Sequence, residues 1–114
     1  MHETGIAQNM VKSVLAAAEQ HGLQRVSGVF VTLGALQNFT PDHLQSHFRE
    51  AAEGTIAADA RVHCDIVPGR ARCLACGHEF PLDQELTPCP QCHDGQVKVI
   101  SGMELIVDGL EAPD

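Results

Sequence analysis

Two cysteine pairs with the same spacing, Cys73-x-x-Cys76 and Cys89-x-x-Cys92, are the feature that most constrains this chain. A gap of two residues lets the backbone turn back, so that both sulfurs of a pair point at one metal ion. Two such pairs about a dozen residues apart are typical of a structural zinc site with four thiolate ligands. Four sulfurs leave no open position on the ion for a substrate. The sequence therefore predicts structural zinc here, and any further chemistry elsewhere.

The residues around the cysteine pairs leave alternatives open. A redox disulfide is the main rival interpretation, although two matched pairs argue against it. His78 and His93 lie beside the pairs and could replace a thiolate or contact the ligands, but histidines in such places are more often exposed to solvent. Cys64, the fifth cysteine, lies on the apolar face of an expected strand and is interpreted as a small buried residue.

Composition excludes several classes of function. The chain has 114 residues, 15 acidic against 7 basic, and a formal charge of -8 at pH 7. Such a chain is a poor electrostatic match for nucleic acid. We expect no secretory signal and no membrane span, because no apolar run is long enough. Reduced thiols without an export signal then indicate the cytoplasm.

Hydrophobic periodicity predicts an α+β fold, with a small antiparallel or mixed three-stranded sheet, two helices and an inserted zinc-ribbon module. In the second helix Thr40 is the expected N-cap and Pro41 the first helical residue. Residues 69–98 are too short to bury a core alone. We expect residues 1–68 and 99–114 to form one discontinuous domain and residues 69–98 the inserted zinc domain. The expected elements are a helix over 3–20, a strand over 25–33, a helix from Pro41 to Gly54, a strand over 61–67 and a strand over 98–110.

The first three residues, Met1-His2-Glu3, offer a second set of metal ligands. A free α-amino group titrates near neutral pH, and the imidazole of His2 lies one residue away. With the intervening amide nitrogens deprotonated, these groups can surround a square-planar ion. Nickel(II) and copper(II) favour that geometry, whereas zinc does not. Spacing alone is a weak signal, because a histidine at the second position is often incidental.

Several motifs follow one another in order along the whole chain. They are Met1-His2-Glu3, a long first helix, Leu33-Gly34-x-Leu36, Gly54-Thr55, the two cysteine pairs, and Gly102-x-Glu104-Leu105. Together these motifs resemble the HypA/HybF family of hydrogenase maturation proteins. The resemblance implies a nickel metallochaperone, not an enzyme, that delivers nickel(II) to the large subunit of nickel–iron hydrogenase and works with the GTPase HypB.

The resemblance also implies roles for single residues. His2 would be the essential nickel ligand, and Met1 and Glu3 would add amine or backbone nitrogens. Zinc would be structural, on Cys73, Cys76, Cys89 and Cys92, and the protein would be a monomer or a homodimer. The chain departs from the family in one loop, where Ala35 and Asn38 stand in place of the usual acidic residues. The resemblance therefore gives no carboxylate contact from that loop.

Two other functions remain to be weighed against metal delivery. A zinc-ribbon adaptor that docks a protein and carries no metal would not need His2. A zinc hydrolase would need one of the four cysteines to be dispensable for zinc binding. His43 and His47 are four residues apart on the second expected helix, a spacing that suits a partner-facing pair or an accessory metal site.

Overall fold

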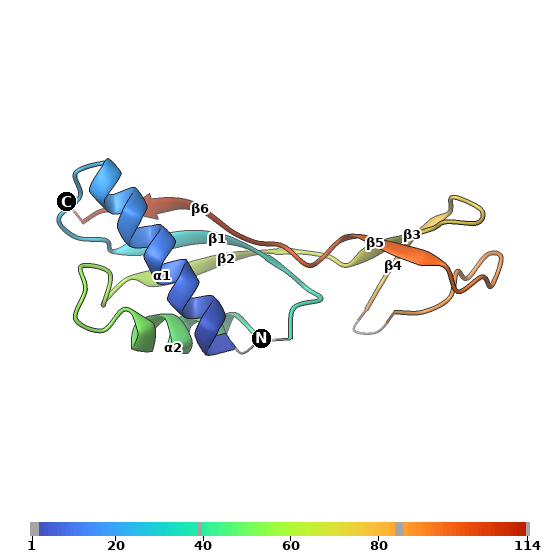
Figure 1. The fold of residues 1–114 in the computed structure, drawn as a ribbon, viewed down its shortest axis with the longest axis horizontal. Coiled ribbons are helices and arrows are strands. Elements are labelled where there is room, and N and C mark those ends of the chain that lie inside the picture. Colours follow the sequence, from blue (N-terminus) through green and yellow to red (C-terminus); the bar gives the residue numbers. More distant parts are fainter. Residues whose placement is uncertain (1–2, 39, 84–85, 114) are drawn as a thin grey trace. The chain divides into compact units, whose positions relative to one another are not determined.

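The computed structural model describes residues 3–38, 40–83 and 86–113. Within these residues the chain forms two helices and six strands (Figure 1). In order they are α1 (Glu3–Gln20), β1 (Gly28–Gly34), α2 (Pro41–Ala51), β2 (Arg61–Val67), β3 (Arg70–Cys73), β4 (Glu79–Pro81), β5 (Val97–Ser101) and β6 (Leu105–Glu111).

The chain divides into two compact units. The first comprises Met1–Val31, Phe39–Asp65 and Ile106–Asp114, and the second comprises Thr32–Asn38 and Ile66–Leu105. The described part of the chain has two three-stranded sheets, with strand orders β2-β1-β6 and β4-β3-β5. The α+β fold class is therefore confirmed. The domain boundaries expected at 68/69 and 98/99 stay predictions.

Backbone hydrogen bonds near the ends of β1 show that β6 runs antiparallel to it. The Ser27 N–H donates to the Glu111 carbonyl (2.8 Å), and the Gly34 N–H donates to the Glu104 carbonyl (2.7 Å). Residue numbers thus rise along one strand as they fall along the other, which is the antiparallel pattern.

The other neighbour of β1, strand β2, runs parallel to it. The Arg61 N–H donates to the Ser27 carbonyl (3.0 Å), and the Ala35 N–H donates to the Val67 carbonyl (2.8 Å). Parallel neighbours need a crossover connection, and α2 supplies it. The first sheet is therefore mixed, with β1 in the middle.

Both helices begin and pack as the sequence predicts. The Thr40 side chain accepts a hydrogen bond from the His43 N–H (3.2 Å), and Pro41 opens α2. In Figure 1, α1 crosses in front of the first sheet, and α1 packs against α2. The core of the first unit includes Ala7, Met10, Val11, Val14 and Ala18 from α1, Val29 and Val31 from β1, and Leu44 and Phe48 from α2.

The second unit has a small core of its own. It consists of Ala71, Cys73, Phe80, Leu82 and Cys89, with Leu36, Val97 and Val99 packed against it. Leu36 and Val99 lie outside residues 69–98. The five buried residues all lie within residues 69–98, so the expectation that this segment cannot bury a core alone stays a prediction.

The expectation of one strand over residues 98–110 is wrong. Two strands occupy this region: β5 pairs antiparallel with β3, and β6 belongs to the other sheet. Gly102 divides them, because its backbone has φ +106°, a value that side-chain-bearing residues rarely adopt. A Cβ at Gly102 would lie 2.6 Å from the Gly69 Cα, so the position also requires glycine for space.

The two phenylalanines Phe48 and Phe30 give a matched test of this core. Phe48 is fully buried, whereas Phe30 is 42% exposed. We expect Phe48→Ala to lower the free energy of unfolding by about 3–5 kcal/mol, because it removes a buried ring and leaves a cavity. We expect Phe30→Ala to cost about 1 kcal/mol or less. Denaturant unfolding of the metal-loaded protein measures both, and equal losses would contradict the assignment of the core face.

Candidate metal centre

The first cysteine pair forms a tight turn at the end of β3. The Cys73 N–H donates to the His78 carbonyl (2.9 Å), and the Gly77 N–H donates back to the Cys73 carbonyl (2.9 Å). The Cys76 N–H points at the Cys73 sulfur (3.4 Å). The turn thus brings both sulfurs of the pair to the same side of the backbone.

The second pair repeats this turn in a segment without regular secondary structure. The Cys89 N–H donates to the Asp94 carbonyl (3.0 Å), and the His93 N–H donates to the Cys89 carbonyl (2.8 Å). Gly77 and His93 hold equivalent positions, four residues after the first cysteine, and both have positive φ, at 80° and 63°. The two turns therefore have the same backbone conformation. His93 occupies the position that Gly77 holds in the first turn, where a positive φ favours glycine.

The two turns bring the four sulfurs together. The sulfur of Cys73 lies 3.4 Å from that of Cys92, and the sulfur of Cys76 lies 3.7 Å from that of Cys89. All four lie within 4.8 Å of one another. A tetrahedral zinc ion with Zn–S bonds of about 2.3 Å requires sulfurs about 3.8 Å apart. The cluster therefore fits an ion such as zinc without rearrangement of the backbone.

The electrostatics of the cluster also favour a cation. The Cys76 N–H is the main cause that lowers the pKa of Cys73 to about 7. The Asp94 N–H lowers the pKa of Cys92, but the Cys73 side chain and desolvation outweigh it and raise that pKa to about 12. Four sulfurs this close do not all ionise on their own, whereas a dication stabilises all four thiolates together.

The histidines beside the cage are not part of the sulfur cluster. His78 is half-buried and stacks on Phe80, with ring centroids 6.1 Å apart, and His93 is exposed. On α2, His43 is exposed and His47 is half-buried. Within residues 3–38, 40–83 and 86–113, the four cysteines form the one group of three or more potential ligands. The structure therefore offers no third ligand for an accessory site on α2 among these residues.

Cys64 lies apart from the cluster and is half-buried in β2. Burial raises its pKa above the ordinary value. A thiol of this kind is a poor ligand and a poor nucleophile at neutral pH, which agrees with its predicted role as a small apolar residue.

The predicted nickel ligands fall at the edge of the described chain. Met1 and His2 lie outside the described residues, and Glu3 is the first residue of α1. The assignment of Met1, His2 and Glu3 to nickel therefore stays a prediction.

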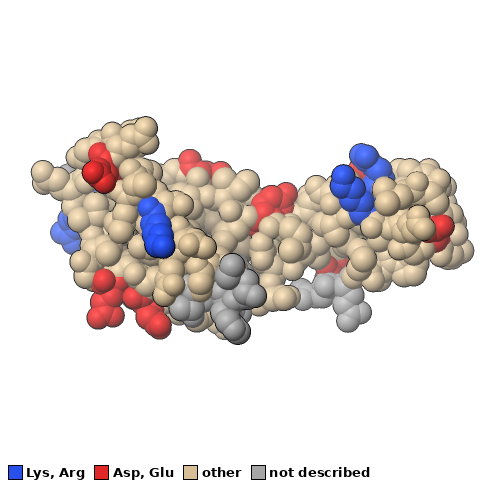
Figure 2. Space-filling view, in the orientation of Figure 1, with Lys and Arg blue, Asp and Glu red and all other residues tan. Residues whose placement is uncertain are grey.

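Charged side chains are mixed in sign on the surface shown in Figure 2. Basic side chains gather over β3, where Arg70 and Arg72 both pair with Glu79, at 3.9 and 2.8 Å. Glu79 therefore offsets part of the positive charge of these two arginines. In the described residues, no helix combines the length and the apolar character that crossing a membrane requires.

Comparisons with known proteins cover almost the whole chain. A family model described as "Hydrogenase/urease nickel incorporation, metallochaperone, hypA" matches residues 1–112. The hydrogenase maturation factor HypA of Rhodopseudomonas palustris (strain BisA53) is 37% identical over 111 residues, covering 97% of this chain and 98% of that protein. The factor HybF of Salmonella typhimurium is 33% identical, again covering 97% and 98%.

A solved structure shares the fold. The solution structure of the nickel metallochaperone HypA from Helicobacter pylori aligns with a TM-score of 0.71 at 21% identity, covering 98% of this chain and 97% of that one. At this identity the alignment shows that the two proteins share a fold over nearly the whole of both chains.

Gly77 and Gly95 test whether the turn conformation supports metal binding. A Cβ at either residue meets no atom within 4 Å, but only Gly77 has positive φ. We expect Gly77→Ala to weaken metal retention about fivefold, because the strained backbone costs about 1 kcal/mol. Gly95→Ala should leave retention unchanged. Competition with a zinc chelator measures both variants, and equal effects would show that the left-handed turn does not matter.

Proposed function

The chain belongs to the HypA family of nickel-incorporation metallochaperones, and from that premise we propose that it binds nickel(II) at its N-terminus and delivers it to the large subunit of a nickel–iron hydrogenase. The observation that carries the proposal is the match of the family model over residues 1–112, which includes both sets of candidate ligands. Relatives at 33–37% identity over nearly the whole chain bear names of hydrogenase maturation factors.

Cys73, Cys76, Cys89 and Cys92 would hold zinc in this account. Zinc would cross-link two turns that are far apart in sequence, which is a structural role. Four thiolates saturate a tetrahedral ion, so this site does not serve an ion that must be taken up and released. The cargo therefore needs other ligands.

Nickel would bind to nitrogen at the start of the chain. The α-amino group of Met1, the imidazole of His2 and the backbone nitrogens of His2 and Glu3 can form the planar set that nickel(II) favours and zinc does not. Protons compete for the same nitrogens, so acidification releases the ion. Delivery is then ligand exchange with the partner, with no covalent chemistry on the protein.

The proposal includes the partners and the compartment. We assign nucleotide hydrolysis to a HypB-type GTPase, because the sequence contains no glycine-rich phosphate-binding loop. The large subunit of the hydrogenase would receive the ion. Both steps would take place in the cytoplasm, where the free thiols stay reduced.

His2→Ala separates nickel binding from zinc binding. We expect nickel affinity to fall more than about a hundredfold, since loss of a direct ligand exceeds the usual cost of losing an outer-shell partner. Zinc content should not change. His43→Ala is the matched control, because His43 is exposed on α2 and should affect neither metal. Calorimetric titration of the zinc-loaded protein measures both. Full activity in hydrogenase maturation without His2 would favour the adaptor function instead.

Addition of one residue before Met1 tests the terminal amine. The extension places one more peptide unit between the terminal amine and the His2 imidazole. The His2 side chain itself is unchanged. We expect nickel affinity to fall at least about tenfold, and the visible absorption of planar nickel to disappear. An unchanged affinity would refute the role of the amine but leave that of His2 intact.

A further inference from the structure

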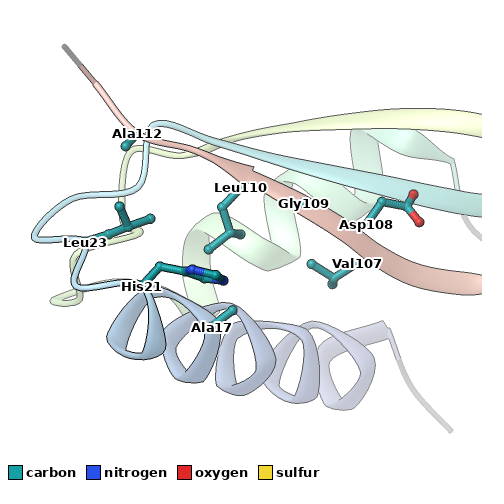
Figure 3. A pocket seen from close by; sticks show the side chains of 8 residues that line it. All are labelled: Ala17, His21, Leu23, Val107, Asp108, Gly109, Leu110 and Ala112. Carbon is teal, nitrogen blue, oxygen red and sulfur yellow. The ribbon is translucent and has the colours of Figure 1, made fainter.

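A cavity of about 430 Å³ lies between the C-terminal turn of α1 and strand β6 (Figure 3). The cavity belongs to the first unit, and none of its lining residues is a candidate metal ligand. Its lining consists of Ala17, His21 and Leu23 from α1 and the segment that follows, and Val107, Asp108, Gly109, Leu110 and Ala112 from β6 and its end. Most of these residues are apolar.

The backbone of β6 forms part of the cavity wall. Four consecutive residues of the strand line it, including Gly109, which has no side chain. Strand β6 is also the edge of the sheet, because the strand order is β2-β1-β6. One side of β6 pairs with β1, and no strand within the described residues pairs with the other. An edge strand is a template for a further strand.

The side chains at the cavity suit an apolar anchor. Figure 3 shows Val107 and Leu110 pointing toward α1, with the His21 imidazole and Ala17 facing them, whereas Asp108 points away. An edge strand beside an apolar pocket is the arrangement by which proteins recognise extended peptides. Main-chain hydrogen bonds provide affinity, and the pocket selects a side chain.

The charges indicate what kind of segment would fit. Strand β6 carries Asp108 and Glu111 and no basic residue. The last turn of α1 also has no basic residue, so the partial negative charge of its C-terminus is not compensated from within the helix. A segment with lysine or arginine beside its apolar anchor complements this surface, whereas an acidic segment is repelled.

We propose that β6 and the adjoining cavity form a docking site for an extended, basic segment of a partner protein. The segment adds a strand to β6 and inserts one aliphatic side chain between Ala17 and Leu110. This inference does not depend on nickel binding, since none of its residues belongs to either metal site.

A second copy of this chain is the less suitable occupant. Antiparallel pairing of two β6 strands would bring the acidic residues of one strand close to those of the other. Like charges on paired strands are destabilising. The chain is also acidic overall, with a formal charge of -8. Electrostatic interactions therefore do not favour self-association through this edge.

The test uses a peptide and the intact, zinc-loaded protein. The probe is an acetylated and amidated ten-residue peptide that alternates lysine with valine and has one central leucine. We expect it to shift the backbone amide signals of Val107 and Gly109 in NMR spectra and to slow their hydrogen exchange. The same peptide with alternate amides N-methylated along one edge should bind at least about tenfold more weakly, because it cannot pair with β6.

Two alanines of α1 provide a matched pair of variants. Ala17→Leu fills the cavity and should weaken peptide binding about tenfold or more, since the anchor loses its pocket. Ala16→Leu adds the same group at a neighbouring exposed residue and should leave the affinity unchanged. Amide spectra show that both variants remain folded.

Four results would overturn the proposal. They are no binding at about 1 mM peptide, equal binding of the methylated peptide, equal effects of the two leucine variants, and a concentration-dependent dimer that Ala17→Leu abolishes. The last result would assign the edge to a second copy of the chain.

Discussion

The approach of four sulfurs to within 4.8 Å of one another, a geometry that fits one metal ion, is the constraint on which the second unit depends. Cys73 and Cys89 are almost fully buried and belong to the small core of that unit, so the sulfur cluster and the hydrophobic core share these two residues. The raised pKa of Cys92 shows that the sulfurs resist joint ionisation without a cation. A saturated cage cannot also exchange a cargo ion. In the proposed function, that saturation is the reason why nickel would need a separate site of nitrogen ligands.

The segments Leu33-Gly34-x-Leu36 and Gly102-x-Glu104-Leu105 are hydrogen-bonded to each other. The Gly34 N–H donates to the Glu104 carbonyl, and the Leu36 N–H donates to the Gly102 carbonyl. The Glu104 carboxylate in turn accepts from the Gly102 N–H (2.6 Å). A Cβ on Gly34 would lie 2.0 Å from the Gly102 oxygen. These residues therefore hold two distant segments of the second unit at close range. Packing and hydrogen bonding therefore give these residues a structural role.

Local periodicity was enough to predict α1, α2 and β2, whose apolar residues and caps follow one pattern from end to end. The pattern failed at residues 98–110, because alternation continues through Gly102 although the backbone turns there. Strands β3 and β4 were not predicted, since their pairing depends on the two cysteine turns and not on their own short sequences. The four-cysteine cluster was predictable from spacing. The left-handed backbone at His93 and the cavity beside β6 were not, because both arise from tertiary structure that no local pattern encodes.

X-ray absorption spectroscopy of protein loaded with one zinc and one nickel ion tests the central claim most directly. The account predicts a zinc edge with four sulfur neighbours at about 2.3 Å, and a nickel edge with a planar shell of four nitrogens and no sulfur. Sulfur neighbours at nickel, or nitrogen replacing sulfur at zinc once nickel is added, would contradict it, because the two ions would then share the cysteines.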